Sequence, residues 1–296
     1  MVVERIFQVK DVQKHPCLIS AAAFVFVCIS VILATMAHQP PMGFFIIALT
    51  VMPAIPFFMR MTICEEKKEE LLMKFISAIP EKKFEKGKRE GLVSLYDDII
   101  KLYVYFFLGC VIGFAFTSSI MPAETSRSMF MDLQFLSPNT PDVSFWGIFS
   151  HNFKLMLIMV FFSVVYSIGA IFLLVLNGAI IGLFLEQEIR AAISGLSYLG
   201  VLTYPSAFVL GSLNGILKLL PHGMWEFSAF FMASVAGGIL SVAIERKAYK
   251  RMPLFKKILF DIAKLLMLAI LLVAVGAFIE SSYPMVRDLL KIIKIE

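Results

Sequence analysis

Long apolar stretches alternate with shorter polar ones along most of this 296-residue chain. A helix that crosses a lipid bilayer needs roughly 20 predominantly apolar residues. The stretches that meet or approach this length lie at about 16–37, 42–59, 102–121, 153–177, 199–218, 221–244 and 258–279. The pattern predicts an all-α fold, a polytopic transmembrane helix bundle of about seven spans.

Composition supports this class of protein. Hydrophobic residues make up 59% of the chain and charged residues 17%, whereas soluble domains carry roughly 45–50% apolar and about 25% charged residues. Membrane lipids are therefore the expected surroundings, and the net charge of +5 does not indicate nucleic-acid binding. The four cysteines form no C-x-x-C pair, so we expect no disulfide framework, no metal site and no cofactor.

Lys and Arg indicate the orientation of the spans. They concentrate in the N-terminal tail and in segments 60–101 and 245–257. The positive-inside rule then predicts a multi-pass protein of the cell membrane with a cytoplasmic N-terminus and an outside C-terminus. On this topology Arg190 lies on the cytoplasmic side and the loop 122–152 lies outside.

Glycines four residues apart recur in the predicted spans. Such pairs let two helix backbones approach closely, either within one bundle or between subunits, and they support the expectation of a homo-oligomer. The pairs are Gly109/Gly113, Gly178/Gly182 and Gly211/Gly215. Leu176-Asn177-Gly178 also echoes Leu213-Asn214-Gly215, as weakly repeated halves of transporters do, and it predicts a helix break at Asn177 and Gly178.

Four polar residues are predicted to lie at one membrane depth, at the outer ends of their spans: Asn152, Asn214, His222 and Glu226. The turn between the fifth and sixth spans is expected to be only a few residues long, which would make the four converge. Polar groups in a membrane are costly unless paired, so the cluster is a candidate binding site. A structural helix cap explains it equally well, because Pro221 suits a first helical position and Glu226 lies near the positive helix end.

The segment Leu220-Pro221-His222-Gly223-Met224-Trp225-Glu226-Phe227-Ser228-Ala229 resembles the stage II sporulation protein M family, whose signature includes P-H-G-x-x-E-x-x-A. Three further features are similar to that family: Asn177-Gly178-x-x-x-Gly182, Asn152 and Gly109-x-x-x-Gly113. The resemblance covers roughly residues 101–280. It implies a five-helix membrane core with no soluble catalytic domain. The named member is a membrane scaffold for peptidoglycan-degrading enzymes during engulfment.

This resemblance and the polarity pattern together divide the chain into four parts. They are an N-terminal tail with two transmembrane helices (1–63), a lysine-rich cytoplasmic amphipathic insertion (64–100), the five-helix core (101–280) and a C-terminal tail (281–296).

Three functions remain open at this point. The first is a non-enzymatic scaffold that oligomerises and recruits partner membrane or envelope proteins; it has no catalytic residues. The second is a transporter or channel for a small solute or lipid. The third is an intramembrane hydrolase using His222 and Glu226, which supply only two metal ligands where catalytic zinc has three protein ligands.

Overall fold

A computed structural model describes most of the chain, and its helices carry almost all of the described residues. Those residues are 16–37, 41–56, 58, 97–134, 144–166, 169–245, 247–250 and 252–293. No strand occurs among them. The expected all-α class is therefore confirmed. The tail 1–15 and nearly all of the lysine-rich insertion 64–100 lie outside the described residues.

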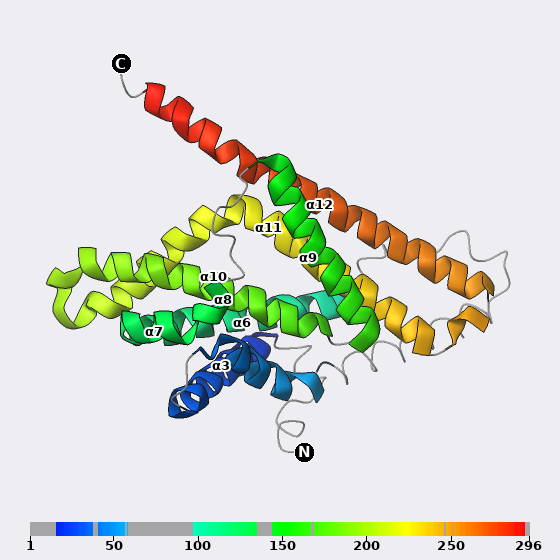
Figure 1. The fold of residues 1–296 in the computed structure, drawn as a ribbon, viewed down its shortest axis with the longest axis horizontal. Coiled ribbons are helices and arrows are strands. Elements are labelled where there is room, and N and C mark those ends of the chain that lie inside the picture. The colour runs from blue at the N-terminus through cyan, green and yellow to red at the C-terminus, as the bar shows by residue number, and fades with distance from the viewer. Residues whose placement is uncertain are drawn as a thin grey trace.

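Figure 1 shows the helices as an elongated, layered bundle. In chain order they are α3 (Cys17–Ala37), an apolar helix over Gly43–Pro56, α6 (Asp97–Ile120), α7 (Ala123–Met129), α8 (Met131–Gln134), α9 (Phe145–Tyr166), α10 (Gly169–Gly195), the 3-10 helix η2 (Ser197–Leu202), α11 (Thr203–Glu245), the 3-10 helix η3 (Ala248–Lys250) and α12 (Met252–Ile293).

Six helices in the described part of the chain are long and apolar enough to cross a membrane. Their apolar segments are Cys17–Ala37, Lys101–Ile120, Phe145–Val164, Ile171–Gly195, Ser197–Ser241 and Ile258–Ser282. The Gly43–Pro56 helix is also apolar but shorter, in line with the short second span that the sequence indicates. A polytopic membrane bundle is confirmed, although several span boundaries differ from the predicted ones.

The predicted fourth span, 153–177, is divided between two helices. α9 ends at Tyr166 and α10 begins at Gly169. α10 then continues through Asn177 and Gly178, so the predicted helix break at these residues is wrong. A glycine inside a helix can serve close packing instead of a break, and Gly178 does so, because a Cβ there would lie 3.3 Å from the Cβ of Cys110.

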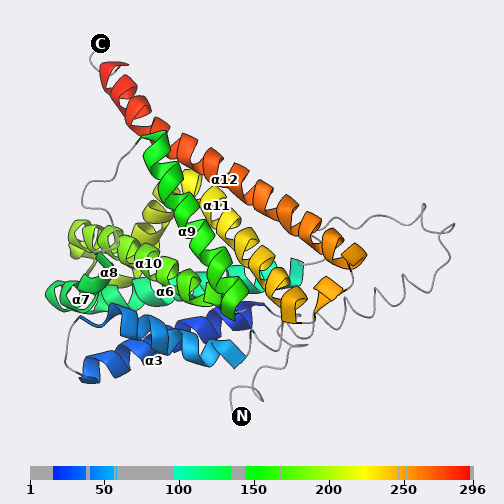
Figure 2. The same ribbon diagram turned by 45° about the vertical axis from the view of Figure 1, so that its right-hand side comes forward.

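The predicted fifth and sixth spans form one helix. α11 runs for 43 residues with Pro221 inside it, so the expected turn between 218 and 221 is wrong. Proline removes one helical hydrogen bond and bends a helix without necessarily ending it. Figures 1 and 2 show α11 bent near its middle, and its contacts place one arm beside α10 and the other beside α9 and α12.

Contacts at the glycines give the relative directions of the helices. Gly178 and Gly182 of α10 face Cys110 and Phe114 of α6, so residue numbers rise together and these helices are parallel. α3 and α6 are also parallel, since Gly109 faces Ser20 and Gly113 faces Val27. α11 returns antiparallel to α10, because Gly211 faces Ile189 and Gly215 faces Leu185.

The parallel pair α6 and α10 corrects the predicted place of Arg190. The Arg190 guanidinium contacts the main chain of Ser118 and Met121 at the end of α6. Arg190 and the segment after Met121 therefore lie at the same end of the bundle, not on opposite sides. The prediction failed because it treated 153–177 as one span and missed the additional helix start at Gly169. The additional helix places Arg190 at the opposite end of the bundle from the predicted one.

Two hydrophobic cores hold these helices together. The larger core joins α3, the Gly43–Pro56 helix, α6, α7, α8 and α10, together with parts of α11 and α12, and Phe114 and Phe130 are fully buried in it. The smaller core joins α9, α11 and α12 through Met156, Met159, Ala229, Phe230, Ala233, Ala269 and Val273. The alanines let α11 and α12 pack closely.

Candidate functional site

The segment between α6 and α9 contains a small polar surface, which we call the platform and define as α7 and α8, Ala123–Gln134. Its inner side packs on the larger core through Met129, Phe130 and Leu133, and the Phe130 ring meets the Phe114 ring edge-on at 6.1 Å. Its outer side is exposed and polar, with the side chains of Glu124, Thr125, Arg127 and Ser128. The platform is thus amphipathic, and its apolar inner side is fixed by packing against the larger core.

Asp132 attaches the platform to the Gly43–Pro56 helix. Its two carboxylate oxygens accept hydrogen bonds from the backbone N–H groups of Gly43 and Phe44, at 3.0 and 2.9 Å. These groups are among the unsatisfied donors at a helix start, where a carboxylate also complements the helix dipole. Next to them, the Met42 N–H donates to the Met129 carbonyl at 2.9 Å. A residue far away in sequence therefore caps this short helix.

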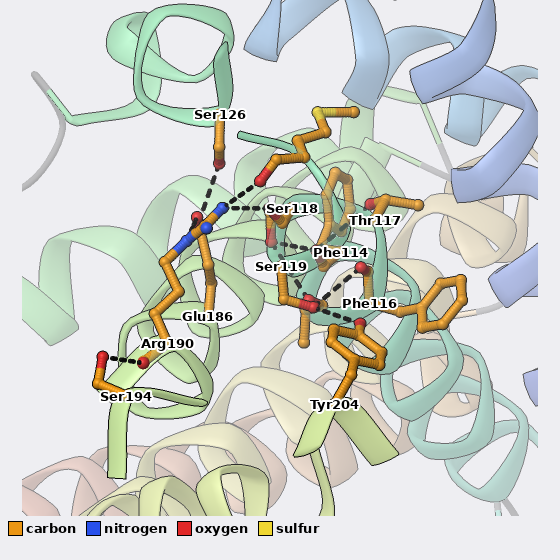
Figure 3. Close-up of polar contacts among 12 residues, drawn as sticks. Phe114, Phe116, Thr117, Ser118, Ser119, Ser126, Glu186, Arg190, Ser194 and Tyr204 are labelled. Atoms are coloured by element: carbon orange, nitrogen blue, oxygen red, sulfur yellow. Dashed lines mark hydrogen bonds and ion pairs between the residues drawn. The ribbon is translucent and has the colours of Figure 1, made fainter. Parts of the chain in front are cut away.

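A second attachment, which we call the capping network, consists of Ser126, Glu186, Arg190 and the carbonyls of Ser118 and Met121 (Figure 3). The Arg190 Nη2 group donates to both carbonyls at 2.7 Å, and Nε donates to Glu186 Oε1 at 2.7 Å. The Ser126 hydroxyl donates to Glu186 Oε2 at 3.0 Å.

The capping network satisfies groups that a membrane helix end otherwise leaves without partners. The last carbonyls of α6 have no intrahelical donor and carry the negative end of the helix dipole, which an arginine complements. Glu186, only 8% exposed, has a partner on each carboxylate oxygen. The network ties α6, α7 and α10 together with balanced charge. The i,i+4 spacing of Glu186 and Arg190 is the sequence signal that would have indicated their pairing.

The predicted polar cluster is only partly assembled. Asn152 of α9 and Glu226 of α11 meet directly: the amide Nδ2 donates to Glu226 Oε1 at 2.6 Å. They are 8% and 9% exposed. Gly276 of α12 closes this site, since a Cβ there would lie 2.8 Å from Glu226 Cγ and 3.4 Å from the His222 carbonyl oxygen. His222 lies one turn before Glu226, and Glu280, one turn after Gly276, is near enough to interact electrostatically with Glu226.

Asn214 does not join that cluster. Its amide donates to Glu188 Oε2 at 2.7 Å, and Lys218 Nζ donates to Glu188 Oε1 at 2.6 Å. The prediction required a tight turn between Asn214 and His222. Because α11 is continuous, about three turns of helix separate Asn214 from Glu226 at 3.6 residues per turn.

All six predicted packing glycines face another helix of the same chain. Gly109 and Gly113 face α3, Gly178 and Gly182 face α6, and Gly211 and Gly215 face α10. The alternative of packing within one bundle accounts for all three pairs. No group of three His, Cys, Asp or Glu residues in the described part of the chain is placed to hold a metal ion.

Several long apolar helices with few charges define a polytopic α-helical membrane protein. The stage II sporulation protein M family matches residues 102–283, more than half of the chain, and the chain belongs to this family. The resemblance seen in the sequence is confirmed. This is not a known enzyme family.

One similar protein is an uncharacterized protein of Methanocaldococcus jannaschii. It is 27% identical over 184 residues, which cover 62% of this chain and 90% of that protein. No solved structure matches the chain.

Proposed function

We propose that the chain is a non-enzymatic membrane scaffold of the stage II sporulation M type, which oligomerises and recruits partner proteins at its platform. The observation that carries this proposal is the fixed position of the platform. Asp132, Met129 and Ser126 connect it to two other helices. A surface held in one shape loses little conformational entropy when a partner binds, and this favours affinity.

The exposed chemistry of the platform suits a protein partner. Glu124 and Arg127 present both signs of charge beside the hydroxyls of Thr125 and Ser128, and Met131 is 46% exposed next to them. Interfaces commonly combine a polar rim with an apolar anchor, and methionine is enriched in them. We propose a partner whose charges complement this pattern.

The proposed homo-oligomer requires a surface other than the glycine pairs, because each pair already packs against another helix of the same chain. The exposed apolar side chains of α3 offer one such surface, including Ile29, Ile32 and Met36. The oligomeric form in native membranes can be measured by native mass spectrometry together with an Ile32→Trp variant. A dimer that this variant weakens supports the surface on α3.

Site-specific photo-crosslinking in native membranes tests recruitment. A photoreactive residue at Thr125 or Ser128 is expected to form a discrete adduct with a protein, and the double variant Glu124→Lys/Arg127→Glu should remove it. Met267 of α12, 71% exposed on an apolar helix face, is the control position. Adducts with lipid alone, or the same adducts from Met267, would reject the docking role of the platform.

A transporter or channel is the second candidate, and the Asn152–Glu226 pair is the observation that favours it. Ionisable groups buried among membrane helices often mark ion or proton pathways. In proteoliposomes with a pH-sensitive dye inside, this candidate predicts a proton flux that Glu226→Gln removes while the fold remains intact. Equal dye response with wild type, the variant and empty liposomes would exclude a proton flux.

A further inference from the structure

The platform lies level with the interior of the neighbouring spans. Ser126 hydrogen-bonds to Glu186, and α10 continues from there to Gly195, roughly 14 Å further at 1.5 Å per residue. The Phe130 ring meets the ring of Phe114, which lies roughly 9 Å before the end of α6 by the same measure. α7 and α8 therefore turn back beside α6 and α10 as a re-entrant pair (Figures 1 and 2).

The outer face of α7 carries two charges that have no ion-pair partner in the described part of the chain. Glu124 and Arg127 are both exposed, and neither forms an ion pair with another described residue. The charged side chains beside them differ, because Glu186 pairs with Arg190 and Asp132 accepts from two backbone N–H groups. Glu124 and Arg127 are thus available to a group outside the described residues.

Neither lipid nor water alone suits this face. Charged side chains at membrane depth are strongly disfavoured against lipid, and they usually face protein or a water-filled cavity. The side chains next to these charges are apolar: Met131 is 46% exposed, and Phe44, whose N–H donates to Asp132, is 41% exposed. A water-filled cavity would leave both of them in water, whereas a protein surface can cover charged and apolar groups together.

A mostly apolar helix with one basic and one acidic residue would match this mixed face. Ionisable side chains on different membrane helices pair with one another, so such a helix could neutralise Glu124 and Arg127 while its apolar residues contact Met131 and Phe44. A soluble domain is a poorer match, since it would have to reach past the end of α10 and into the depth of the spans.

We propose that the platform binds a transmembrane helix of a partner protein within the membrane, through Glu124 and Arg127. This assignment rests on the proposed recruitment at the platform and adds the class of partner, an integral membrane protein. Glu124 and Arg127 are three residues apart and so lie on neighbouring turns of α7. Their basic and acidic partners are therefore expected about one helical turn apart on the bound helix.

Depth-dependent fluorescence quenching tests the position of the platform. The chain is placed in nanodiscs whose lipids carry a quencher either at the head group or in the acyl chain. A fluorophore is attached at Ser128→Cys on α7 or, as the matched control, at Ser194→Cys near the end of α10, in a background without native cysteines; both serines are exposed. At Ser128→Cys we expect acyl-chain quenching to exceed head-group quenching at least twofold, and at Ser194→Cys the reverse.

Photo-crosslinking from Thr125 in native membranes tests the class of partner. The membranes are first washed with alkaline carbonate, which removes peripheral proteins and leaves integral ones. We expect the protein adduct to keep at least half of its yield after this wash. Each single variant, Glu124→Lys or Arg127→Glu, should lower the yield at least fivefold, because it places like charges opposite each other in the contact.

Four results would overturn this assignment. A fluorophore at Ser128→Cys no deeper than one at Ser194→Cys would place the platform at the membrane surface. An adduct that the carbonate wash removes would identify a peripheral partner and leave recruitment itself standing. An adduct of two copies of this chain would show that a second copy covers the platform. The absence of any protein adduct before the wash would reject recruitment, and the transmembrane partner with it.

Discussion

Glu186 and Glu226 are buried to nearly the same extent, 8% and 9% exposed, but their surroundings differ. Glu186 has a guanidinium on one carboxylate oxygen and a hydroxyl on the other. Glu226 has one neutral amide donor, from Asn152, and a second carboxyl, Glu280, in its vicinity. Among the described residues no Lys or Arg forms an ion pair with Glu226.

The difference in partners suggests that Glu186 has a structural role, whereas Glu226 is a candidate functional group. A buried charge whose pairing is complete holds its neighbours in place, and removal of its partner is strongly destabilising. A buried carboxyl without a cation can be accommodated as the neutral acid, or by a cation that enters the site. The capping network therefore helps to fix the platform, together with the contacts of Asp132 and Met129. The Asn152–Glu226 pair is instead the reason to keep transport as a second candidate.

The largest effect is expected from Arg190→Ala. It leaves Glu186 as an uncompensated buried charge and removes the donor to the Ser118 and Met121 carbonyls, at a cost of about 3–5 kcal/mol. The free energy of unfolding can be measured in micelles by denaturant titration, followed by tryptophan fluorescence. Arg127→Ala, on the exposed face of α7, is the control and should lie within about 0.5 kcal/mol of wild type. Equal losses in the two variants would contradict the role of the capping network.

Glu186→Gln tests the same network from the acidic side. Its amide cannot form the charge-assisted hydrogen bond with Arg190, and such bonds to charged groups contribute about 1.5–3 kcal/mol. We therefore expect a loss of this size, measured by the same titration. A wild-type free energy of unfolding in Glu186→Gln would show that the ion pair contributes nothing to stability.

Glycine substitutions compare the packing at the α6–α10 contact with the packing at the Asn152–Glu226 pair. A Cβ at Gly182 would lie 2.5 Å from Phe114 Cβ and 3.0 Å from the Ala115 backbone nitrogen, so Gly182→Ala should cost about 1–3 kcal/mol through overpacking. At Gly276 the nearest atom is the Glu226 side chain, which can move, so the loss should be smaller. At Gly238 no atom lies within 4 Å of the position that a Cβ would take, so Gly238→Ala is the control. If Gly238→Ala is as destabilising as Gly182→Ala, the assigned α6–α10 contact is wrong.

The smallest effect is expected from Glu226→Gln. Glutamine keeps an oxygen that can accept from Asn152, so the free energy of unfolding should change by no more than about 0.5–1 kcal/mol. Asn152→Leu removes that donor and leaves the carboxyl without its neutral partner, so it should destabilise the protein more than Glu226→Gln. A larger loss in Glu226→Gln than in Glu186→Gln would reverse the comparison.

Much of the fold could be predicted because apolar length is a strong signal. The boundaries were harder to predict. The residues near Gly169 continue an apolar run, so hydropathy does not show that a second helix starts there. Pro221 suits a helix start and a helix bend equally well, and only packing against α9, α10 and α12 decides between them.

The polar cluster was predicted only in part. Asn152 and Glu226 were identified correctly as neighbours, because buried polar groups in a membrane need partners. Asn214 was placed with them through a turn that does not exist. The capping network was missed, since its carbonyl acceptors belong to the main chain and have no side-chain signal in the sequence.

The central claim is that the capping network is needed to hold the platform in place and the Asn152–Glu226 pair is not. Amide hydrogen exchange of residues 123–134 in nanodiscs tests it most directly, by comparison of wild type, Arg190→Ala and Glu226→Gln. Slow exchange is predicted in wild type and in Glu226→Gln, with exchange at least tenfold faster across these residues in Arg190→Ala and little change in α9. Rapid exchange of the platform in wild type, or equal acceleration in both variants, would contradict the account.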